Sequence, residues 1–198
     1  MIAIYNFQSP MRYNSQHVEA TRARVLEACA RQFRRYGFGG VGVEALSHAA
    51  NVTSGAFYNH FGSKAGAFAA VVKAGVERLR VAVERFRQAH GGRWLPAFVA
   101  YYLGEGHRRD VAGGCLLPSL SAEVGRADAA TRAAYEAELL AVAALVAEGL
   151  PGKPGREAAW PILASLAGGV MLSRAVADPS LSQEIADAVR SAIQAGER

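Results

Sequence analysis

The spacing of apolar residues along the chain predicts helices over most of its length. Apolar side chains recur at steps of three and four positions, which is the spacing of one face of an α-helix. This pattern holds over residues 16–36, 64–89, 128–149, 156–177 and 180–195. No segment alternates apolar and polar residues in the manner of a half-buried strand. The pattern therefore predicts an all-α fold of about nine helices.

Two short predicted helices, residues 43–50 and 54–61, are separated by a tight turn. Thr53 can cap the second helix with its hydroxyl, and Phe57 and Phe61 lie four positions apart on the face that packs inward. The other face is small, polar and partly aromatic, with Ser54, Gly55, Tyr58, Asn59 and His60. A helix that is buried on one side and polar on the other fits the major groove of DNA. Helix pairs with short turns also occur in many proteins that bind no DNA, so spacing alone leaves both interpretations open.

The residues in and around this helix pair resemble one family. Residues 24–72 are similar to the DNA-binding domain of the TetR family of transcriptional repressors, most clearly at Phe57, Tyr58, His60, Phe61, Ser63 and Lys64. The resemblance implies a homodimer in which each subunit places its second short helix in the major groove of a near-palindromic DNA operator. It also implies a helical body that binds a small molecule and thereby releases the DNA.

The resemblance assigns DNA contacts to particular positions. Tyr58 and His60 match positions that contact sugar-phosphate or base edges, and Lys64 matches a position beside a phosphate. The other assigned positions begin the helix or approach the floor of the groove: Thr53, Ser54, Gly55, Ala56 and Asn59. Two positions depart from the family pattern. Gly42 replaces the usual capping Thr or Ser, and Ser54 replaces a frequent Lys or Arg.

Charge divides the chain into two parts. Residues 1–90 hold 12 Lys or Arg and 5 Asp or Glu, whereas residues 91–198 hold 10 and 12. A basic part joined to a nearly neutral remainder is typical of a nucleic-acid-binding unit on a body with another task. We expect a disordered extension at residues 1–15, which contains Met11 as an alternative start, and a helix-turn-helix domain at residues 16–63. A linking helix at residues 64–89 and a ligand-binding and dimerisation domain at residues 90–198 should follow.

The body contains aromatic residues that suit a ligand cavity. An apolar interior between helices is a common place for a small apolar, aromatic or electrophilic effector, and Trp and Tyr add polar groups to it. The predicted effector pocket consists of Phe86, Trp94, Phe98, Tyr101, Tyr102, Cys115 and Trp160. Packing in the core is the alternative role for these aromatic residues.

Cys115 has two interpretations. Residues 114–124 resemble a subset of the TetR family in which a cysteine at the start of a helix senses electrophiles or oxidants. The positive end of a helix favours a thiolate, and Arg108 and Arg109 are near enough in sequence to add to that effect. The alternative is a buried structural thiol, which is the commoner state of a free cysteine. Cys29 is predicted to be a core residue of this kind.

The two last predicted helices have small and aliphatic faces. The family resemblance implies that they pair with their copies in a second subunit as a four-helix bundle. The predicted dimer interface consists of Leu163, Gly168, Val170, Met171, Ile185 and Val189. The same faces would serve equally well in an internal core. Between the two helices, Ser180 and Gln183 have the spacing of a capping box.

Other classes of function have less support. The chain has no HExxH, CxxC or GxSxG motif, its histidines are scattered, and no metal site or cofactor is predicted. A small helical enzyme would need His107 as the base for Cys115, without an evident carboxylate to orient the histidine. A nonspecific DNA-binding protein is the other alternative. No apolar run approaches the roughly 20 residues that span a bilayer, so we expect no membrane partner and a cytoplasmic location.

Overall fold

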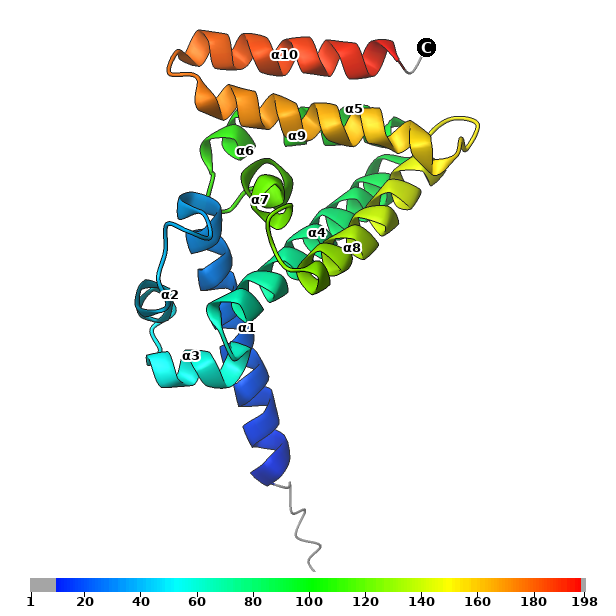
Figure 1. Ribbon diagram of the computed structural model, residues 1–198. Coiled ribbons are helices and arrows are strands. Elements are labelled where there is room, and N and C mark those ends of the chain that lie inside the picture. Colours follow the sequence, from blue (N-terminus) through cyan, green and yellow to red (C-terminus); the bar gives the residue numbers. More distant parts are fainter. Residues whose placement is uncertain (1–9, 197–198) are drawn as a thin grey trace, which may run out of the picture.

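The computed structural model describes the backbone of residues 10–196 and the side chains of residues 18–196. In this part of the chain it contains ten α-helices, two 3₁₀-helices and no strand, so the predicted all-α class is confirmed. Figure 1 shows a small head formed by α1, α2 and α3 and a larger body formed by α5 to α10, with α4 extending from one to the other. The α-helices are α1 (Pro10–Tyr36), α2 (Val43–Ala49), α3 (Ser54–Phe61), α4 (Lys64–His90), α5 (Trp94–Tyr102), α6 (Glu105–Arg109), α7 (Leu116–Val124), α8 (Ala129–Glu148), α9 (Ala159–Ala175) and α10 (Pro179–Ala195). The 3₁₀-helices are η1 (Gly91–Arg93) and η2 (Arg156–Ala158).

Aromatic side chains form the core of the head near α4. Phe33 of α1 packs edge-on against Phe68 of α4, with 5.4 Å between the ring centroids, and Phe38 packs against both rings. Gly37 ends α1, because it adopts a φ of 75° and donates its N–H to the Phe33 carbonyl at 2.8 Å. In the predicted tight turn between α2 and α3, Asn51 adopts a left-handed conformation with a φ of 53°.

The long helix α4 belongs to both the head and the body. It begins where the Ser63 hydroxyl accepts the Gly66 N–H at 2.9 Å, and it packs mainly along α8 and also against α1, α5 and α7. At the crossing with α7 there is no room for a side chain on Gly75, since a Cβ atom would lie 2.6 Å from Leu116 Cδ1. A displacement of α7 therefore acts directly on α4.

The last two helices, α9 and α10, lie antiparallel across the end of the body that is farthest from α3 (Figure 1). Gly169 brings α9 close to its neighbours, because a Cβ atom there would lie 3.1 Å from Leu103 and 3.2 Å from Val189. Pro161 lies in the first turn of α9, where proline is tolerated and causes no kink.

The stretch Arg156–Ala175 is long and apolar enough, by length and composition alone, to cross a membrane. The expectation that the chain has no such stretch is therefore wrong. Helices in the core of a protein have the same composition, and α9 packs against α5, α6, α7, α8 and α10. Near its end, Arg174 donates hydrogen bonds to the carbonyl oxygens of His107 and Arg108. Internal packing thus accounts for part of the apolar character of α9, since 33% of its most apolar window is buried and Met171 and Leu172 are exposed.

The first helix, α6 and α9 differ most from the sequence-based expectation. The first helix begins at Pro10 and not near residue 16, since proline suits the first turn and no helix breaker follows before Gly37. Residues 10–15 are thus helical, and the rest of the predicted extension, residues 1–9, lies outside the described residues. The five-residue helix α6 was not predicted because it is too short to show periodicity. The eighth predicted helix, at 156–177, is η2 followed by the shorter α9.

The predicted capping box at the start of α10 does not form. Asp178 caps this helix, with its carboxylate accepting the Ser180 N–H at 2.9 Å, and Pro179 occupies the first helical position. Gln183 instead contacts Arg108 of α6 and Asp187. The capping-box prediction is therefore wrong, and Gln183 joins α10 to α6.

Candidate functional site

Helix α3 has one buried side and one exposed side, as a recognition helix requires. Phe57 is fully buried, whereas Tyr58 is 49% exposed. The exposed face carries four of the predicted DNA contacts: Ser54, Gly55, Tyr58 and Asn59. In Figure 1, α3 lies at the edge of the head that faces away from the body. This face is therefore open to a DNA groove.

The other predicted DNA contacts are more tightly held. The Thr53 hydroxyl accepts the Ala56 N–H at 3.2 Å and so caps α3. Ala56 and His60 are half-buried. The Lys64 ammonium lies 4.4 Å from the centroid of the Phe38 ring, within cation–π distance. Lys64 is thus positioned at the start of α4 by the core of the head.

The departure from the family pattern at Gly42 has a visible structural result. Gly42 is the N-cap of α2, and no side chain caps this helix. A Cβ atom at Gly42 would meet no atom within 4 Å, and its backbone is extended with a φ of −91°. A Ser or Thr would therefore fit, and α2 lacks only the hydroxyl that the resemblance leads one to expect there.

The predicted effector residues do not enclose one cavity. Phe98 and Tyr102 are buried in the core, whereas Tyr101 is 56% exposed. Phe86 and Tyr101 line a shallow hollow of about 310 Å³, and Trp94 lines a different groove. Trp160 lines neither of these and packs, partly buried, against the core. The aromatic side chains from Phe86 to Tyr102 are nevertheless continuous, with neighbouring ring centroids 5.2 to 6.2 Å apart.

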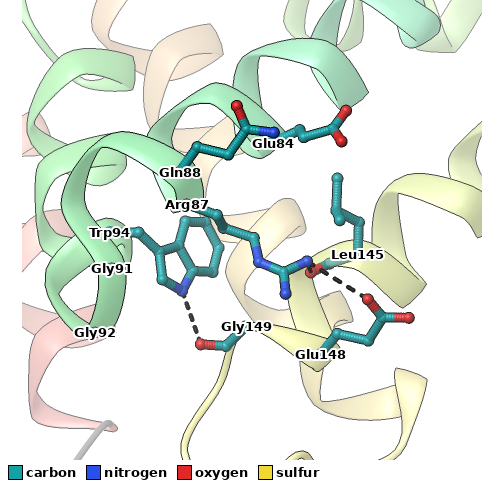
Figure 2. A pocket seen from close by; sticks show the side chains of 9 residues that line it. All are labelled: Glu84, Arg87, Gln88, Gly91, Gly92, Trp94, Leu145, Glu148 and Gly149. Atoms are coloured by element: carbon teal, nitrogen blue, oxygen red, sulfur yellow. Dashed lines mark hydrogen bonds and ion pairs between the residues drawn. The ribbon is translucent and has the colours of Figure 1, made fainter.

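Figure 2 shows the groove that Trp94 lines, where the ends of α4 and α8 meet. Its volume is about 580 Å³. Trp94 Nε1 donates to the Gly149 carbonyl at 2.7 Å, and Arg87 Nη1 donates to the Leu145 carbonyl at 2.9 Å. The same Arg87 nitrogen lies 3.5 Å from the Glu148 carboxylate. These hydrogen bonds fasten α4 to α8, so the groove is a helix junction rather than an apolar ligand cavity.

Cys115 and Tyr102 do come together, and His107 lies with them. The Tyr102 and His107 ring centroids are 4.5 Å apart. His107 Nε2 accepts the Cys115 backbone N–H at 2.8 Å, and His107 Nδ1 lies 2.6 Å from the Tyr102 carbonyl oxygen. Because Nε2 is an acceptor, the proton is on Nδ1 and the ring is neutral. Burial lowers the pKa of His107, which agrees with this neutral form.

The environment of Cys115 does not activate its thiol. Cys115 is the N-cap of α7, but burial raises the pKa of its thiol and outweighs the effect of the Tyr102 hydroxyl. The two guanidinium groups that favour the thiolate belong to Arg174 and Arg34. The prediction that Arg108 and Arg109 have this role is therefore not supported by the structure. Cys29 is buried, unlike the half-buried Cys115, and its pKa is raised to about 11.

The arrangement of His107 and Cys115 does not form a catalytic pair. The histidine nitrogen accepts the backbone N–H of Cys115, so it is not available as a base for the sulfur atom. Among residues 18–196, no three His, Cys, Asp or Glu side chains gather closely enough to hold a metal ion.

Two contacts between the head and the body were not predicted from the sequence. Arg34 of α1, only 4% exposed, donates from Nε to the Ala112 carbonyl at 2.6 Å. The Phe38 N–H donates to both carboxylate oxygens of Glu123, at 2.8 and 3.0 Å. Cys115 lies between Ala112 and Glu123 in the sequence. The segment from residue 112 to residue 123 therefore holds the end of α1 at two points.

The residues predicted for the dimer interface lie in different environments. Leu163 and Val170 are buried within the core of a single chain, where no second subunit can reach them. Gly168, Ile185 and Val189 are half-buried, and Met171 is 53% exposed. Leu172 and Leu181 are large exposed apolar residues that the prediction omitted. An apolar surface that is free for a partner thus exists on α9 and α10, centred on other residues than Leu163 and Val170.

The protonation of His107 gives a testable prediction for stability. The folded pKa of His107 is lowered, so the unfolded chain binds a proton more readily as the pH falls below about 6.5. We expect the free energy of unfolding to decrease between pH 7.5 and 5.5, by about 1.4 kcal/mol for each unit of the pKa difference. Urea unfolding monitored by circular dichroism measures this slope. His107→Gln should reduce the pH dependence of the free energy of unfolding, whereas His90→Gln, at an exposed position, should leave it unchanged. The same pH dependence in both variants would contradict the assignment of this effect to His107.

Comparisons with known proteins identify the head and support the fold of the whole chain. Residues 25–71 match the family model described as bacterial regulatory proteins, tetR family. No curated protein matches the chain. Reduced NemR from E. coli is 22% identical, with a TM-score of 0.74 over 88% of this chain and 96% of that chain. A TetR-family regulator from Cytophaga hutchinsonii is 19% identical, with a TM-score of 0.73 over 90% and 96%.

A TetR regulator from Chloroflexus aurantiacus J-10-FL is also similar, at 22% identity and a TM-score of 0.67 over 90% of this chain and 96% of that chain. At such identities the structural matches show the fold alone, and the family model supplies the identity of the head. The predicted family is confirmed, and the family consists of regulators and not of enzymes. Residues 25–71 are thus a DNA-binding domain of the TetR family, and the chain as a whole has the fold of solved regulators.

Proposed function

We propose that the chain is a cytoplasmic homodimeric repressor that binds a near-palindromic operator and is released by a small molecule or a thiol-reactive compound. Residues 16–63 would form the DNA-binding domain, residues 64–89 the linking helix and residues 90–198 the ligand-binding and dimerisation domain. The observation that carries this proposal is the exposed polar face of α3 opposite the fully buried Phe57. The exposed apolar residues of α9 and α10, among them Met171, support a second subunit on that side of the body.

In this proposal the two heads of a dimer enter successive major grooves, about 34 to 36 Å apart. Tyr58 and Lys64 contact phosphates and supply much of the affinity for DNA. They do not discriminate between DNA sequences, because phosphate contacts carry no sequence information. Asn59 and His60 contact base edges, together with the start of α3. An Asn side chain can make a two-point hydrogen bond with adenine, which gives discrimination between bases.

For DNA to be released, a conformational change in the body must be transmitted to the head. The contacts Arg34–Ala112 and Phe38–Glu123 support such a path, because both join α1 to the segment that contains Cys115. Movement of this segment would displace α1 and alter the separation of the two heads. For a tenfold loss of DNA affinity, the signal must favour the released form by about 1.4 kcal/mol.

Cys115 is the residue through which a thiol-reactive signal would act. With a quinone, the sulfur adds to a ring carbon, the thiol proton passes to the ring system, and the product is a hydroquinone thioether. The raised pKa of the Cys115 thiol makes this reaction slow at neutral pH. The adduct would have no room beside the buried Tyr102 and would displace the start of α7. A noncovalent effector among the aromatic residues is the other form of the signal.

The direct test of the proposed function is binding to the DNA upstream of the chain's own gene, with excess competitor DNA. Protection of a short inverted repeat by two subunits is the expected result. Binding that the competitor removes without preference would contradict specific regulation. Asn59→Ala separates these cases, since a specific regulator loses base preference and a nonspecific binder does not.

The role of Lys64 predicts a change in salt dependence. Lys64→Ala should weaken binding to all DNA sequences and reduce the slope of log affinity against log salt by about one unit per subunit, because one phosphate contact is lost. Fluorescence anisotropy from 50 to 200 mM salt measures the slope. Lys73→Ala, an exposed lysine farther along α4, is the matched control. A slope that is unchanged in Lys64→Ala would exclude the phosphate contact.

The role of Cys115 predicts release of operator DNA by benzoquinone. The native protein should lose DNA binding in proportion to the modified thiol, faster at pH 9 than at pH 7, whereas Cys115→Ser should keep its DNA. Mass spectrometry of the same samples counts the adducts. Equal release from the native protein and Cys115→Ser would show that modification elsewhere, or a ligand effect alone, is responsible.

A further inference from the structure

A polar hollow lies where α6, the end of α9 and the start of α10 meet. Its volume is about 590 Å³. The charged and polar side chains that line it include Glu105, Arg108, Arg109, Arg174, Ser182 and Gln183. Three arginines thus face one glutamate, and that glutamate already pairs with Arg109 at 2.9 Å. The hollow is separate from the aromatic residues and from the DNA-binding face.

Arg108 is the unusual residue of this hollow. It is only 7% exposed, and within residues 18–196 no carboxylate oxygen lies within 4 Å of its nitrogens. A buried charge is unfavourable unless an opposite charge or many hydrogen bonds compensate it. The other buried arginine of residues 18–196, Arg34, differs because the Glu27 carboxylate lies 3.7 Å from it.

The hydrogen bonds of Arg108 leave part of its guanidinium group free. Nη1 donates to the Ser182 hydroxyl at 2.8 Å, and Nη2 donates to the Gln183 side-chain oxygen. Nε is buried and has no partner. A guanidinium group has five N–H donors, so one N–H on each of Nη1 and Nη2 remains for an oxyanion in the hollow, whereas the buried Nε–H does not reach it. Since the Ser182 oxygen accepts from Arg108, its own hydrogen is free to donate to the same oxyanion.

The surroundings of Arg108 add positive potential and an apolar wall. Arg174 is held by hydrogen bonds to neutral groups only, among them the carbonyl oxygens of His107 and Arg108 and the Ser119 hydroxyl. No carboxylate oxygen of residues 18–196 lies within 4 Å of its nitrogens, and the more distant Asp110 carboxylate offsets only part of its charge. Val111, Val176 and Pro179 also line the hollow. An anionic group with a small apolar portion matches these features.

We propose that this hollow binds a small ligand through an oxyanion, a carboxylate or a phosphate, which Arg108 and Ser182 hold. Binding there is independent of the DNA-binding function proposed above. The apolar wall suits an organic acid, and the guanidinium fork suits either anion.

The test is isothermal titration of the full-length protein with sodium benzoate, with benzamide as the neutral analogue and with inorganic phosphate. Benzoate or phosphate should bind, and benzamide should not. Ser182→Ala, which removes one donor at a half-buried position, should weaken the binding about tenfold, and Arg108→Met should abolish it. Preference for benzoate over phosphate identifies a carboxylate site, and the reverse identifies a phosphate site.

Arg190→Met is the matched control, because Arg190 lies on α10 outside the hollow and its Nε is also buried without a partner. This variant should bind like the native protein. Circular dichroism shows whether each variant is folded, and Ser182→Ala keeps the test decisive if Arg108→Met unfolds. Binding of neither anion, or equal binding by the native protein, Ser182→Ala and folded Arg108→Met, would overturn the proposal.

Discussion

The coupling of head to body depends on the contact between Glu123 and the backbone of Phe38. One N–H group donates to both oxygens of a carboxylate, at 2.8 and 3.0 Å, and hydrogen bonds to charged groups contribute about 1.5–3 kcal/mol. The contact requires Gly37 next to it. A Cβ atom on Gly37 would lie 2.6 Å from Glu123 Oε1, and the φ of 75° at this position also favours glycine. Gly37 therefore ends α1 and also leaves the space that the Glu123 carboxylate of α7 occupies.

The second contact, from Arg34 to the Ala112 carbonyl, extends this arrangement to the loop before Cys115. Burial lowers the pKa of Arg34, and the nearby Glu27 carboxylate acts in the opposite direction. On the other side of the loop, Arg174 of α9 donates to carbonyl oxygens of α6. The segment between α6 and α7 is thus held by one arginine from the head and one from α9 of the body. A change at Cys115 or at Arg108 acts on the same short segment.

Much of the head was predictable because its sequence pattern is local. Thr53 caps α3 as expected, Ser63 caps α4, Gly37 and Asn51 adopt positive φ, and Phe57 is buried opposite the exposed Tyr58. Each of these features follows from residues only a few positions apart. The sequence alone therefore indicates which side chains of α3 are exposed.

The body was less predictable because its important contacts join distant residues. Arg34 and Ala112 are 78 positions apart, and Arg108 and Gln183 are 75 apart. Periodicity shows that Leu163 and Val170 are apolar and inward, but it cannot tell an internal core from a subunit interface. The aromatic residues were similarly predicted as a pocket, although Phe98 and Tyr102 fill the core. Helix α6, which supplies both His107 and Arg108, is too short to give a periodic signal.

The central claim is that the segment from Ala112 to Glu123 controls the position of α1. Hydrogen–deuterium exchange at the Phe38 amide tests it most directly, because this N–H is bonded only to the Glu123 carboxylate. The amide should be protected in the native protein, and it should exchange faster when benzoquinone modifies Cys115 and DNA is released. Cys115→Ser should keep the protection under the same treatment. Release of DNA with the Phe38 amide still fully protected would contradict this account.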